Sequence, residues 1–195
     1  MTRVVKTRWA KLYATVAAVM LLSTATTGCG YNQIQSLDER VNQAKGQVQA
    51  QLQRRADLIP NLVETVRGAA RQESTVFTNI ANARARLNGA IQSGDVGQMS
   101  AANAELSQGL GRLLAIVEAY PELKSNQNFL QLQDQLEGTE NRISVARQDY
   151  NNAVGEYNGY IRRFPTNLTA KMFGASEREY FEAEAGAQAA PKVQF

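Results

Sequence analysis

The chain contains no histidine and a single cysteine, and these two shortages exclude several kinds of site. Without histidine there is no Ser-His-Asp triad, no Cys-His nucleophile pair and no Glu-x-x-His ligand set for a di-iron bundle. A zinc site built from cysteine needs more than one thiol, and so does an internal disulfide. We therefore expect no catalytic residue, no metal site and no cofactor, and we predict that the protein is not an enzyme.

Paired carboxylates are the main route to acid–base chemistry that these shortages leave open. Glu105, Glu118, Glu137 and Glu140 could in principle pair for such work. However, 18 acidic residues distributed over a few helices produce neighbours by chance, so we expect solvated helix faces. An enzyme that uses carboxylates, or a Ser/Lys pair, is the third alternative for the function.

Acidic residues are absent from the first 28 positions, which carry Arg3, Lys6, Arg8 and Lys11. The formal net charge of the whole chain is +3, a sign that also fits proteins that bind nucleic acid. Taking these four from the 21 basic residues leaves 17 against 18 acidic residues, so the rest of the chain is almost neutral. No basic surface remains for phosphate contacts, and we expect no nucleic-acid partner.

The first thirty residues have the three-part layout of a secretory signal. A positive region, MTRVVKTRWAK, precedes an apolar stretch from Leu12 to Ala25, and the small residues TTGC follow. Fourteen helical residues cover only about 21 Å, which is shorter than the ~30 Å hydrocarbon core of a bilayer. A removed signal peptide over residues 1–28 is therefore favoured over a permanent span, although counting from Trp9 lengthens the apolar stretch.

Cys29 follows this run and is similar to the modified cysteine of a bacterial lipoprotein. There the thiol, a far better nucleophile than a hydroxyl near neutral pH, is joined to a diacylglycerol through a thioether. Thr26 departs from the pattern, which usually has an aliphatic residue three positions before the cysteine, and Gly30 gives no familiar inner-membrane retention signal. We expect lipidation at Cys29; the alternative is an uncleaved single-pass anchor with an incidental cysteine.

The remaining chain has apolar residues spaced three and four apart, which is the pattern of amphipathic helices. No strand pattern competes with it, so the predicted fold class is all-α, an elongated antiparallel (up-and-down) four-helix bundle. The expected order is a helical pattern over 34–87, a turn at 88–97, a helix over 98–119, a turn at 120–128 with Ser125 or Asn126 as cap, and a last long helix. Before the last helix, the residues expected in the core are Ile34, Leu37, Val41, Ala44, Val48, Leu52, Ile59, Leu62, Val66, Ala69, Val76, Ile80, Ala83, Leu87, Leu106, Leu110, Leu113, Leu114 and Val117.

The last long helix has the clearest apolar seam, and Pro165 is expected to end it. The seam consists of Phe129, Leu132, Leu136, Thr139, Ile143, Ala146, Tyr150, Ala153, Tyr157, Tyr160 and Phe164. Ser176 and Glu179 have capping-box spacing, which predicts a short helix over 176–184. The expected organisation is thus a signal peptide at 1–28, a bundle at 29–165, and a short helix and tail at 166–195.

Two Tyr-Asn pairs, at 150–151 and 157–158, recur one heptad apart in this helix. The favoured interpretation places the rings in the core, with hydroxyls and asparagines satisfying each other at the rim. The alternative is an interaction surface near one end of the bundle.

Pro60 lies inside a helical pattern and should kink or end the helix. Either Asp57 caps a new helix with Pro60 in its first turn, or one long helix bends; the apolar phase continues across Pro60 and favours the bend. Arg55 falls on the expected buried face, as does Glu73, and a buried charge needs partners. The candidate polar network or partner site at the kink comprises Arg54, Arg55, Asp57, Pro60, Asn61 and Glu64. A network that fixes helix register is favoured over a site for a partner or an anion.

A series of long motifs extends over nearly the whole chain after Cys29. They are QRRADLIPNLVETV (53–66), ANARA (81–85), YPELKSNQNFLQLQDQLEGTENRISVARQDYN (120–151), YNGYIRRFPTN (157–167), FGASEREYFEAE (173–184) and PKVQF (191–195). In content and order, this series resembles the LemA family of bacterial envelope proteins. Ala69, Ala70 and Gln72 stand where that family often has an aromatic residue and a histidine.

The resemblance implies an antiparallel helical bundle behind an N-terminal membrane anchor, with no catalytic residues to carry over. It also implies an accessory role beside a membrane-linked metalloprotease or a TPM-domain protein. With the leader, it predicts a lipoprotein of the cell envelope that faces the periplasm or the exterior, in the outer membrane of a two-membrane bacterium. The expected function is a non-catalytic scaffold or adaptor for a membrane-protein partner. The alternatives are a bundle that binds lipid or another apolar ligand, and an uncleaved single-pass protein of the inner membrane with the same domain.

Overall fold

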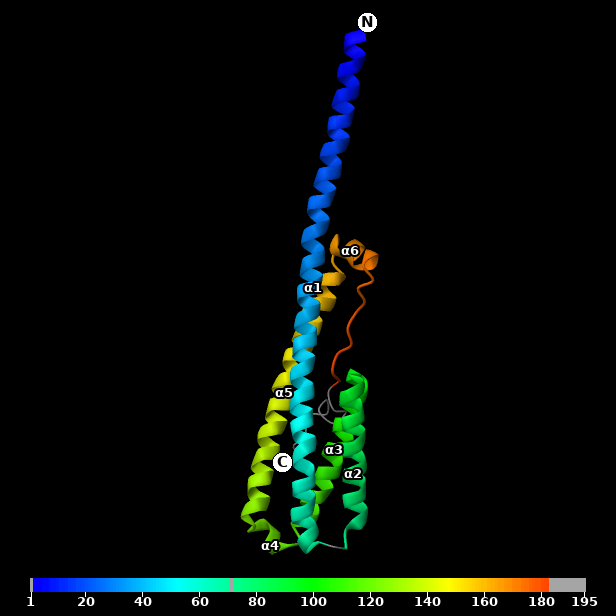
Figure 1. The fold of residues 1–195 in the computed structure, drawn as a ribbon. Helices are drawn as coiled ribbons and strands as arrows, with labels where there is room; N and C mark the ends of the chain where they lie inside the picture. Colours follow the sequence, from blue (N-terminus) through cyan, green and yellow to red (C-terminus); the bar gives the residue numbers. More distant parts are fainter. Residues whose placement is uncertain (1, 71, 183–195) are drawn as a thin grey trace, which may run out of the picture. The chain divides into compact units, whose positions relative to one another are not determined.

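A computed structural model describes the backbone of residues 2–70 and 72–182, and the side chains of residues 30–70 and 72–182. Its helices are α1 (Thr2–Ala69), α2 (Ser74–Ser93), α3 (Val96–Val117), α4 (Pro121–Lys124), α5 (Gln127–Ile161) and α6 (Thr166–Met172), as Figure 1 shows. No strand occurs among the described residues, and the predicted all-α class is confirmed.

The chain divides into two compact units, and α1 and α5 contribute residues to both. The first unit contains Met1–Val41 and Gly155–Arg178, and the second contains Asn42–Val154 and Glu179–Phe195.

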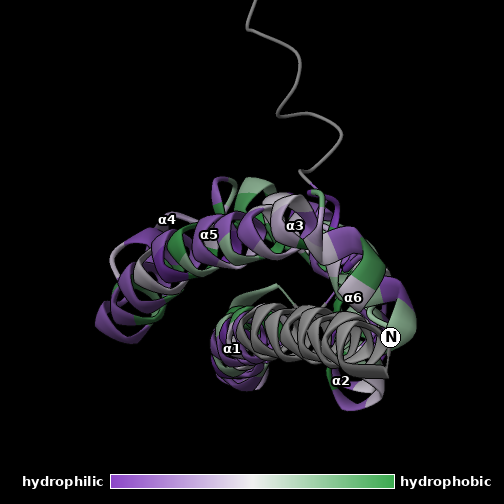
Figure 2. Cartoon of the chain, turned by 90° about the horizontal axis from the view of Figure 1, so that it is seen from above, coloured by the Kyte–Doolittle hydropathy of each residue, from purple (hydrophilic) through white to green (hydrophobic). Residues whose placement is uncertain are grey.

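The second unit is an antiparallel helical bundle, as predicted, built from α2, α3 and the parts of α1 and α5 that it contains. Gln49 of α1 donates a hydrogen bond from Nε2 to the Ile91 carbonyl of α2 at 3.0 Å. Arg86 of α2 forms an ion pair with Glu105 of α3 at 2.7 Å. Figure 2 shows polar (purple) and apolar (green) residues mixed along the coloured helices, as expected for helices that bury only one face. The core contains Val48, Leu52, Ile59, Leu62, Val66, Phe77, Ile80, Leu87, Met99, Leu106, Leu113 and Ile143, among others.

The helical pattern predicted over 34–87 contains a break that the sequence did not indicate. α1 ends at Ala69 and α2 begins at Ser74, and the Glu73 amide donates to the Ala70 carbonyl at 3.2 Å inside the connection. The break shifts the buried phase by one residue, so Ala70 and Phe77 are buried where Ala69 and Val76 were expected. Glu73 therefore lies in the connection and not on a buried helical face.

The two predicted turns are present; the first is shorter than expected, and the second is shifted by two residues and contains α4. Gly94 follows α2 with φ of 69°, a left-handed conformation that favours glycine, and Asp95 caps α3 by accepting a hydrogen bond from the Gln98 amide at 2.8 Å. After the single turn of α4, Asn126 Oδ1 accepts from the Asn128 and Phe129 amides at 2.9 and 3.2 Å. Of the two predicted caps, Asn126 therefore plays this part.

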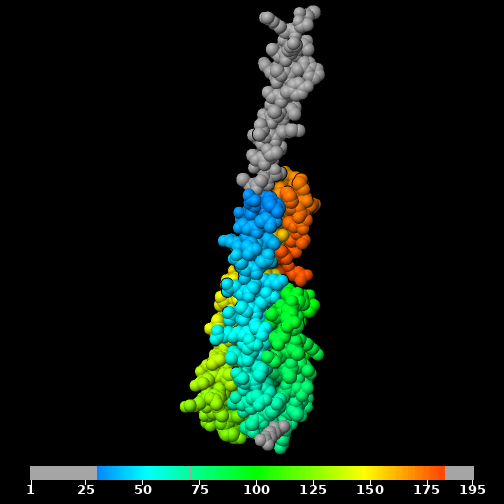
Figure 3. Space-filling model, in the orientation of Figure 1, coloured from blue at the N-terminus to red at the C-terminus, as the bar shows by residue number. Residues whose placement is uncertain are grey.

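The first unit holds the start of the described side chains, the end of α5 and the short helix α6. Arg40 of α1 forms an ion pair with Glu156 of α5 at 3.1 Å. Figure 3 shows the surface of α6, in orange, beside the blue residues that begin at position 30. The ring centroids of Tyr31 and Phe173 lie 4.5 Å apart there, which ties α6 to α1.

The predicted short helix over 176–184 is wrong in position. The short C-terminal helix is α6, and residues 175–182 are not helical. Side chains of α5 provide partners for their peptide groups, so this segment does not need helical hydrogen bonds to satisfy its backbone. The predicted tail beyond residue 182 lies outside the described residues.

The apolar seam predicted for the last helix is correct up to Tyr150 in its main members and includes Tyr157, but two positions after Tyr150 are shifted by one residue. Val154 and Ile161 are buried where Ala153 and Tyr160 were expected, and Phe164 is 80% exposed. α5 ends at Ile161, four residues before Pro165, so Phe164 is not part of the helix at all. Leu114 was also expected in the core, but it is 39% exposed.

The predicted signal peptide at residues 1–28 and the predicted lipidation site at Cys29 lie outside the residues whose side chains the structure describes. Within the described part of the chain, no helix has both the length and the apolar character needed to cross a membrane.

Candidate functional site

Arg55 is a buried charge at the centre of the second unit, where α1, α3 and α5 meet. Its guanidinium donates to Asn103 Oδ1 at 2.7 Å and to Ser107 Oγ at 3.0 Å, both on α3. It also forms an ion pair with Glu140 Oε2 of α5 at 2.7 Å. The Arg55 side chain is 7% exposed and that of Glu140 is 41% exposed, so the pair runs from the core towards solvent.

A groove opens beside this pair, with a volume of about 230 Å³. Most of its lining is apolar and comes from leucines, while carboxylates stand at one side. Its lining residues are Arg55, Leu62, Ser107, Leu110, Gly111, Leu114, Gln133, Leu136, Glu137 and Glu140. Gly111 has no side chain to fill the space, which keeps the groove open between the leucines. The combination of apolar walls and acidic groups fits an apolar ligand or segment that carries a positive charge.

The other residues predicted at the kink lie on the surface and have other partners. Arg54, Asp57, Pro60, Asn61 and Glu64 are all exposed. Asp57 accepts a hydrogen bond from Gln53 at 2.8 Å, and Glu64 forms an ion pair with Arg67 at 3.3 Å. The structure thus brings Arg55 together with α3 and α5, while Asp57 and Glu64 have the partners named above along α1.

Pro60 lies inside α1, which continues to Ala69, so the proline does not end the helix. A proline has no N–H to donate to the carbonyl four residues earlier, and here that carbonyl belongs to Ala56, which is fully buried. Arg84 of α2 donates from Nε to the Ala56 carbonyl at 2.7 Å. A side chain from a neighbouring helix therefore replaces the hydrogen bond that Pro60 removes.

In the second unit, α5 holds the non-helical segment after residue 178 by its peptide groups. The Phe181 amide donates to Asn151 Oδ1 at 2.8 Å, and Asn151 Nδ2 donates back to the Phe181 carbonyl at 3.0 Å. Tyr150 donates its hydroxyl to the Glu179 carbonyl at 2.8 Å. The Phe181 side chain is buried beneath the Arg147 guanidinium, 5.0 Å from the ring centroid, which adds a cation–π contact.

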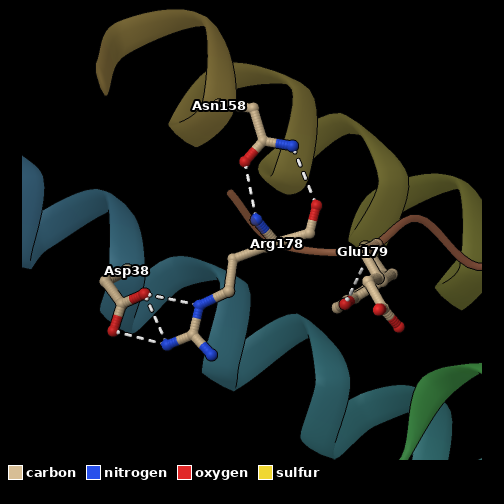
Figure 4. Close-up of polar contacts among 5 residues, drawn as sticks. Asp38, Asn158, Arg178 and Glu179 are labelled. Atoms are coloured by element: carbon tan, nitrogen blue, oxygen red, sulfur yellow. Dashed lines mark hydrogen bonds and ion pairs between the residues drawn. The ribbon is translucent and has the colours of Figure 1, made fainter. Parts of the chain in front are cut away.

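In the first unit, Asn158 makes the same two-way contact with Arg178. The Arg178 amide donates to Asn158 Oδ1 and Asn158 Nδ2 donates to the Arg178 carbonyl, both at 2.8 Å (Figure 4). The Arg178 guanidinium reaches Asp38 of α1, with Nη2 2.7 Å from Oδ1 and Nε 2.9 Å from the same oxygen. Burial raises the pKa of the neighbouring Tyr157 hydroxyl, as does the charge of Asp38, while Arg178 lowers it.

The Tyr-Asn repeat is therefore explained by both of these contacts. Tyr150 and Tyr157 are buried, as expected, but the asparagines satisfy peptide groups of the 175–182 segment and not the tyrosines. The sequence pattern located the right residues on α5 and assigned them the wrong partners.

The candidate carboxylates form no acid–base pair with one another in the contacts seen. Glu105 pairs with Arg86 and Glu140 pairs with Arg55, and Glu118 and Glu137 are exposed. Among the residues that the structure describes, no cluster of three or more His, Cys, Asp or Glu side chains is placed to hold a metal ion.

Comparison with known proteins assigns the family. The model of the LemA family matches residues 44–195 of the chain. This chain belongs to the LemA family. It is also similar to magnetosome proteins MamQ 1 and MamQ 2 of Paramagnetospirillum magneticum, each 29% identical over 86% of this chain and 72% of the relative. Magnetosome protein MamQ of Magnetospirillum gryphiswaldense is 25% identical over 77% of this chain and 64% of the relative.

The contacts of this LemA-family chain connect motifs that are far apart in the sequence. Pro60 of the QRRADLIPNLVETV motif depends on Arg84 of the ANARA motif, through the Ala56 carbonyl. Asn158 of the YNGYIRRFPTN motif holds Arg178 of the FGASEREYFEAE motif. Sequence reasoning gave no role to Arg84, Asn103 or Ser107; an arginine next to a helix with an internal proline is the signal that could have identified Arg84.

Proposed function

We propose that this LemA-family chain is a membrane-anchored, non-catalytic adaptor of the bacterial cell envelope, whose groove binds an apolar segment of a membrane-protein partner. The groove beside Arg55 and Glu140 is the observation that carries the proposal. Leucines on three helices provide apolar contacts, and Leu114 is left 39% exposed at the groove. A contiguous apolar surface, such as this group of leucines, is a usual feature of surfaces that bind other proteins.

The charges at the groove define the partner further. Glu140 is paired with Arg55, but Glu137 beside it is exposed, so an arriving segment meets the negative charge of Glu137. An amphipathic helix with leucine-like side chains and one Lys or Arg complements both properties. The family resemblance favours a membrane metalloprotease or a TPM-domain protein as its source.

A non-catalytic role agrees with the composition and with the relatives. The chain lacks histidine, and the buried Arg55 has structural partners on α3. The similar proteins are named after a cellular structure, the magnetosome, and not after a reaction. A second candidate function, binding of a lipid or another apolar ligand, is supported by the same leucine-lined groove.

A photoreactive amino acid at Leu114 tests both candidates in cells. We expect an adduct with one integral membrane protein, because an inserted helix brings its side chains against this position. Val145 is the matched control, since it is exposed on α5 and is not part of the groove lining. If Leu114 gives adducts of lipid mass alone, the adaptor function is contradicted and the binding of an apolar ligand is supported. Equal labelling at Leu114 and Val145 would contradict both proposed functions.

The proposed anchor is the lipid on Cys29, with the domain on the periplasmic or exterior side. The Cys29→Ser variant is expected to lose all labelling by a radioactive or clickable fatty acid and to accumulate as a longer precursor, because the hydroxyl is a much poorer nucleophile. Mass spectrometry of the mature N-terminus provides the measurement. If the variant still matures and stays in the membrane fraction, the single-pass alternative replaces the lipoprotein.

A further inference from the structure

The first unit exposes apolar side chains that a soluble surface normally hides. Phe164 is 80% exposed, Leu168 58%, Met172 74% and Phe173 55%. Leu168 and Met172 are four residues apart on α6, so they share one face of the helix, while Ala170 on the other side is buried. α6 therefore turns its larger apolar side chains outward, which is the reverse of a helix packed for water.

The stretch of sequence that carries these side chains is basic, although Asp38 lines a pocket together with Phe173. Residues 160–176 contain Arg162, Arg163 and Lys171 and no acidic residue. Arg163 and Lys171 are exposed next to the apolar side chains in the sequence. Arg162 also lies near Glu177, at 3.8 Å, a distance at which the pair is weak and open to exchange.

α6 is held against the point where the proposed anchor begins. A Cβ atom built on Gly30 would lie 3.8 Å from Thr169 Oγ1, and the Tyr31 ring contacts the Phe173 ring at 4.5 Å. Gly30 is the residue directly after Cys29, and neighbouring residues of a helix are separated by about 1.5 Å along its axis. A lipid chain or a membrane span that ends at position 29 therefore brings α6 to the bilayer surface.

We propose that Phe164, Leu168, Met172 and Phe173 form an interfacial patch that inserts into the headgroup region of the bilayer, with Arg163 and Lys171 on anionic phosphates. The proposal rests on the proposed membrane anchor and adds a second, non-covalent attachment. Aromatic and aliphatic side chains flanked by basic residues are the composition of segments that lie in a membrane interface. The patch would fix the orientation of the first unit on the membrane, which a flexible lipid tether alone does not do.

Photocrosslinking of the full-length, membrane-bound protein tests the patch. A benzoylphenylalanine is placed at Leu168 or, as a matched control, at Val145, which is also 58% exposed. We expect lipid adducts, detected as added mass, to form at Leu168 at least about fivefold more than at Val145, because only the former enters the interface. The same ratio is expected for the purified full chain in phosphatidylcholine–phosphatidylglycerol vesicles, where no partner protein is present.

The outcomes separate this proposal from the anchor. If Cys29 carries lipid and the protein is in the membrane fraction, but the two positions give equal lipid adducts, the patch is overturned and the anchor stands. Protein adducts at Leu168 in cells, with no lipid adducts in vesicles, also overturn the patch and assign this surface to a partner. If Cys29 is unmodified and Leu168 still gives lipid adducts selectively, the patch stands without the lipoprotein anchor.

Discussion

Replacing Arg55 with alanine is expected to lower the free energy of unfolding by about 3 kcal/mol, which corresponds to a fall of about 6–12 °C in melting temperature. The reason is the set of groups that Arg55 leaves behind. Asn103 is buried and loses its 2.7 Å hydrogen bond, Ser107 loses another, and Glu140 keeps a charge without this cation. The estimate stays at the lower end for a broken buried pair because Glu140 is 41% exposed and water reaches it. Denaturant unfolding of the full chain in detergent, followed by circular dichroism, provides the measurement.

Arg54 offers the matched control, because it is the same residue type one position earlier and it is exposed. Arg54→Ala is expected to change stability by less than about 0.5 kcal/mol. Replacing both Arg55 and Glu140 with methionine should recover part of the loss, since neither charge is then left without its partner. Equal unfolding of the Arg54 and Arg55 variants would show that the buried arginine does not organise the core.

Arg84→Ala is expected to destabilise the protein by about 2 kcal/mol, because it leaves the buried Ala56 carbonyl without a donor. Pro60→Ala in the same chain should remove most of this loss. Alanine at position 60 supplies the backbone N–H that proline lacks, so the Ala56 carbonyl regains a helical partner. The parent protein, the two single variants and the double variant form a double-mutant cycle. Denaturant unfolding of these four proteins is expected to give a coupling free energy between positions 60 and 84 of about 1 kcal/mol or more.

Arg86→Ala is the control for this cycle, since Arg86 is on the same helix but 66% exposed and paired at the surface with Glu105. Its loss should cost no more than about 0.5–1 kcal/mol and should be indifferent to the residue at position 60. If Pro60→Ala rescues Arg86→Ala as well as Arg84→Ala, the effect is a general gain in helix stability. The specific link between proline and arginine would then be refuted.

Helix existence and class were predictable because the apolar spacing of three and four is a local property of the sequence. Leu52, Ile59, Leu62 and Val66 keep one phase across Pro60, and the structure has one helix there. The break at 70–73 was not predictable in this way, because Gly68 is the only strong helix breaker near it and it lies before the actual end. The short C-terminal helix was misplaced because a capping-box pattern cannot reveal that α5 would bind the same peptide groups.

The candidate site was only partly predictable. The position of Arg55 on an apolar face correctly indicated a buried charge. However, its two hydrogen-bond partners, Asn103 and Ser107, lie 48 and 52 residues further along the chain. Local spacing carries no information about such distant pairing, so the interpretation turned to the neighbours Asp57, Asn61 and Glu64. The outward apolar face of α6 was missed for a related reason, since Phe164 continues the seam of α5 in sequence although the helix stops at Ile161.

The two-way contacts of Asn151 and Asn158 determine which mutations the segment after α6 tolerates. Each carboxamide binds one backbone N–H and one backbone carbonyl, so these hydrogen bonds do not depend on the side chain at the bound position. Substitutions at positions 178 and 181 therefore leave these main-chain hydrogen bonds in place. Proline is the exception, because it has no N–H to donate. Selection at these two positions acts on other matters: the charge that meets Asp38, and the ring that lies under Arg147.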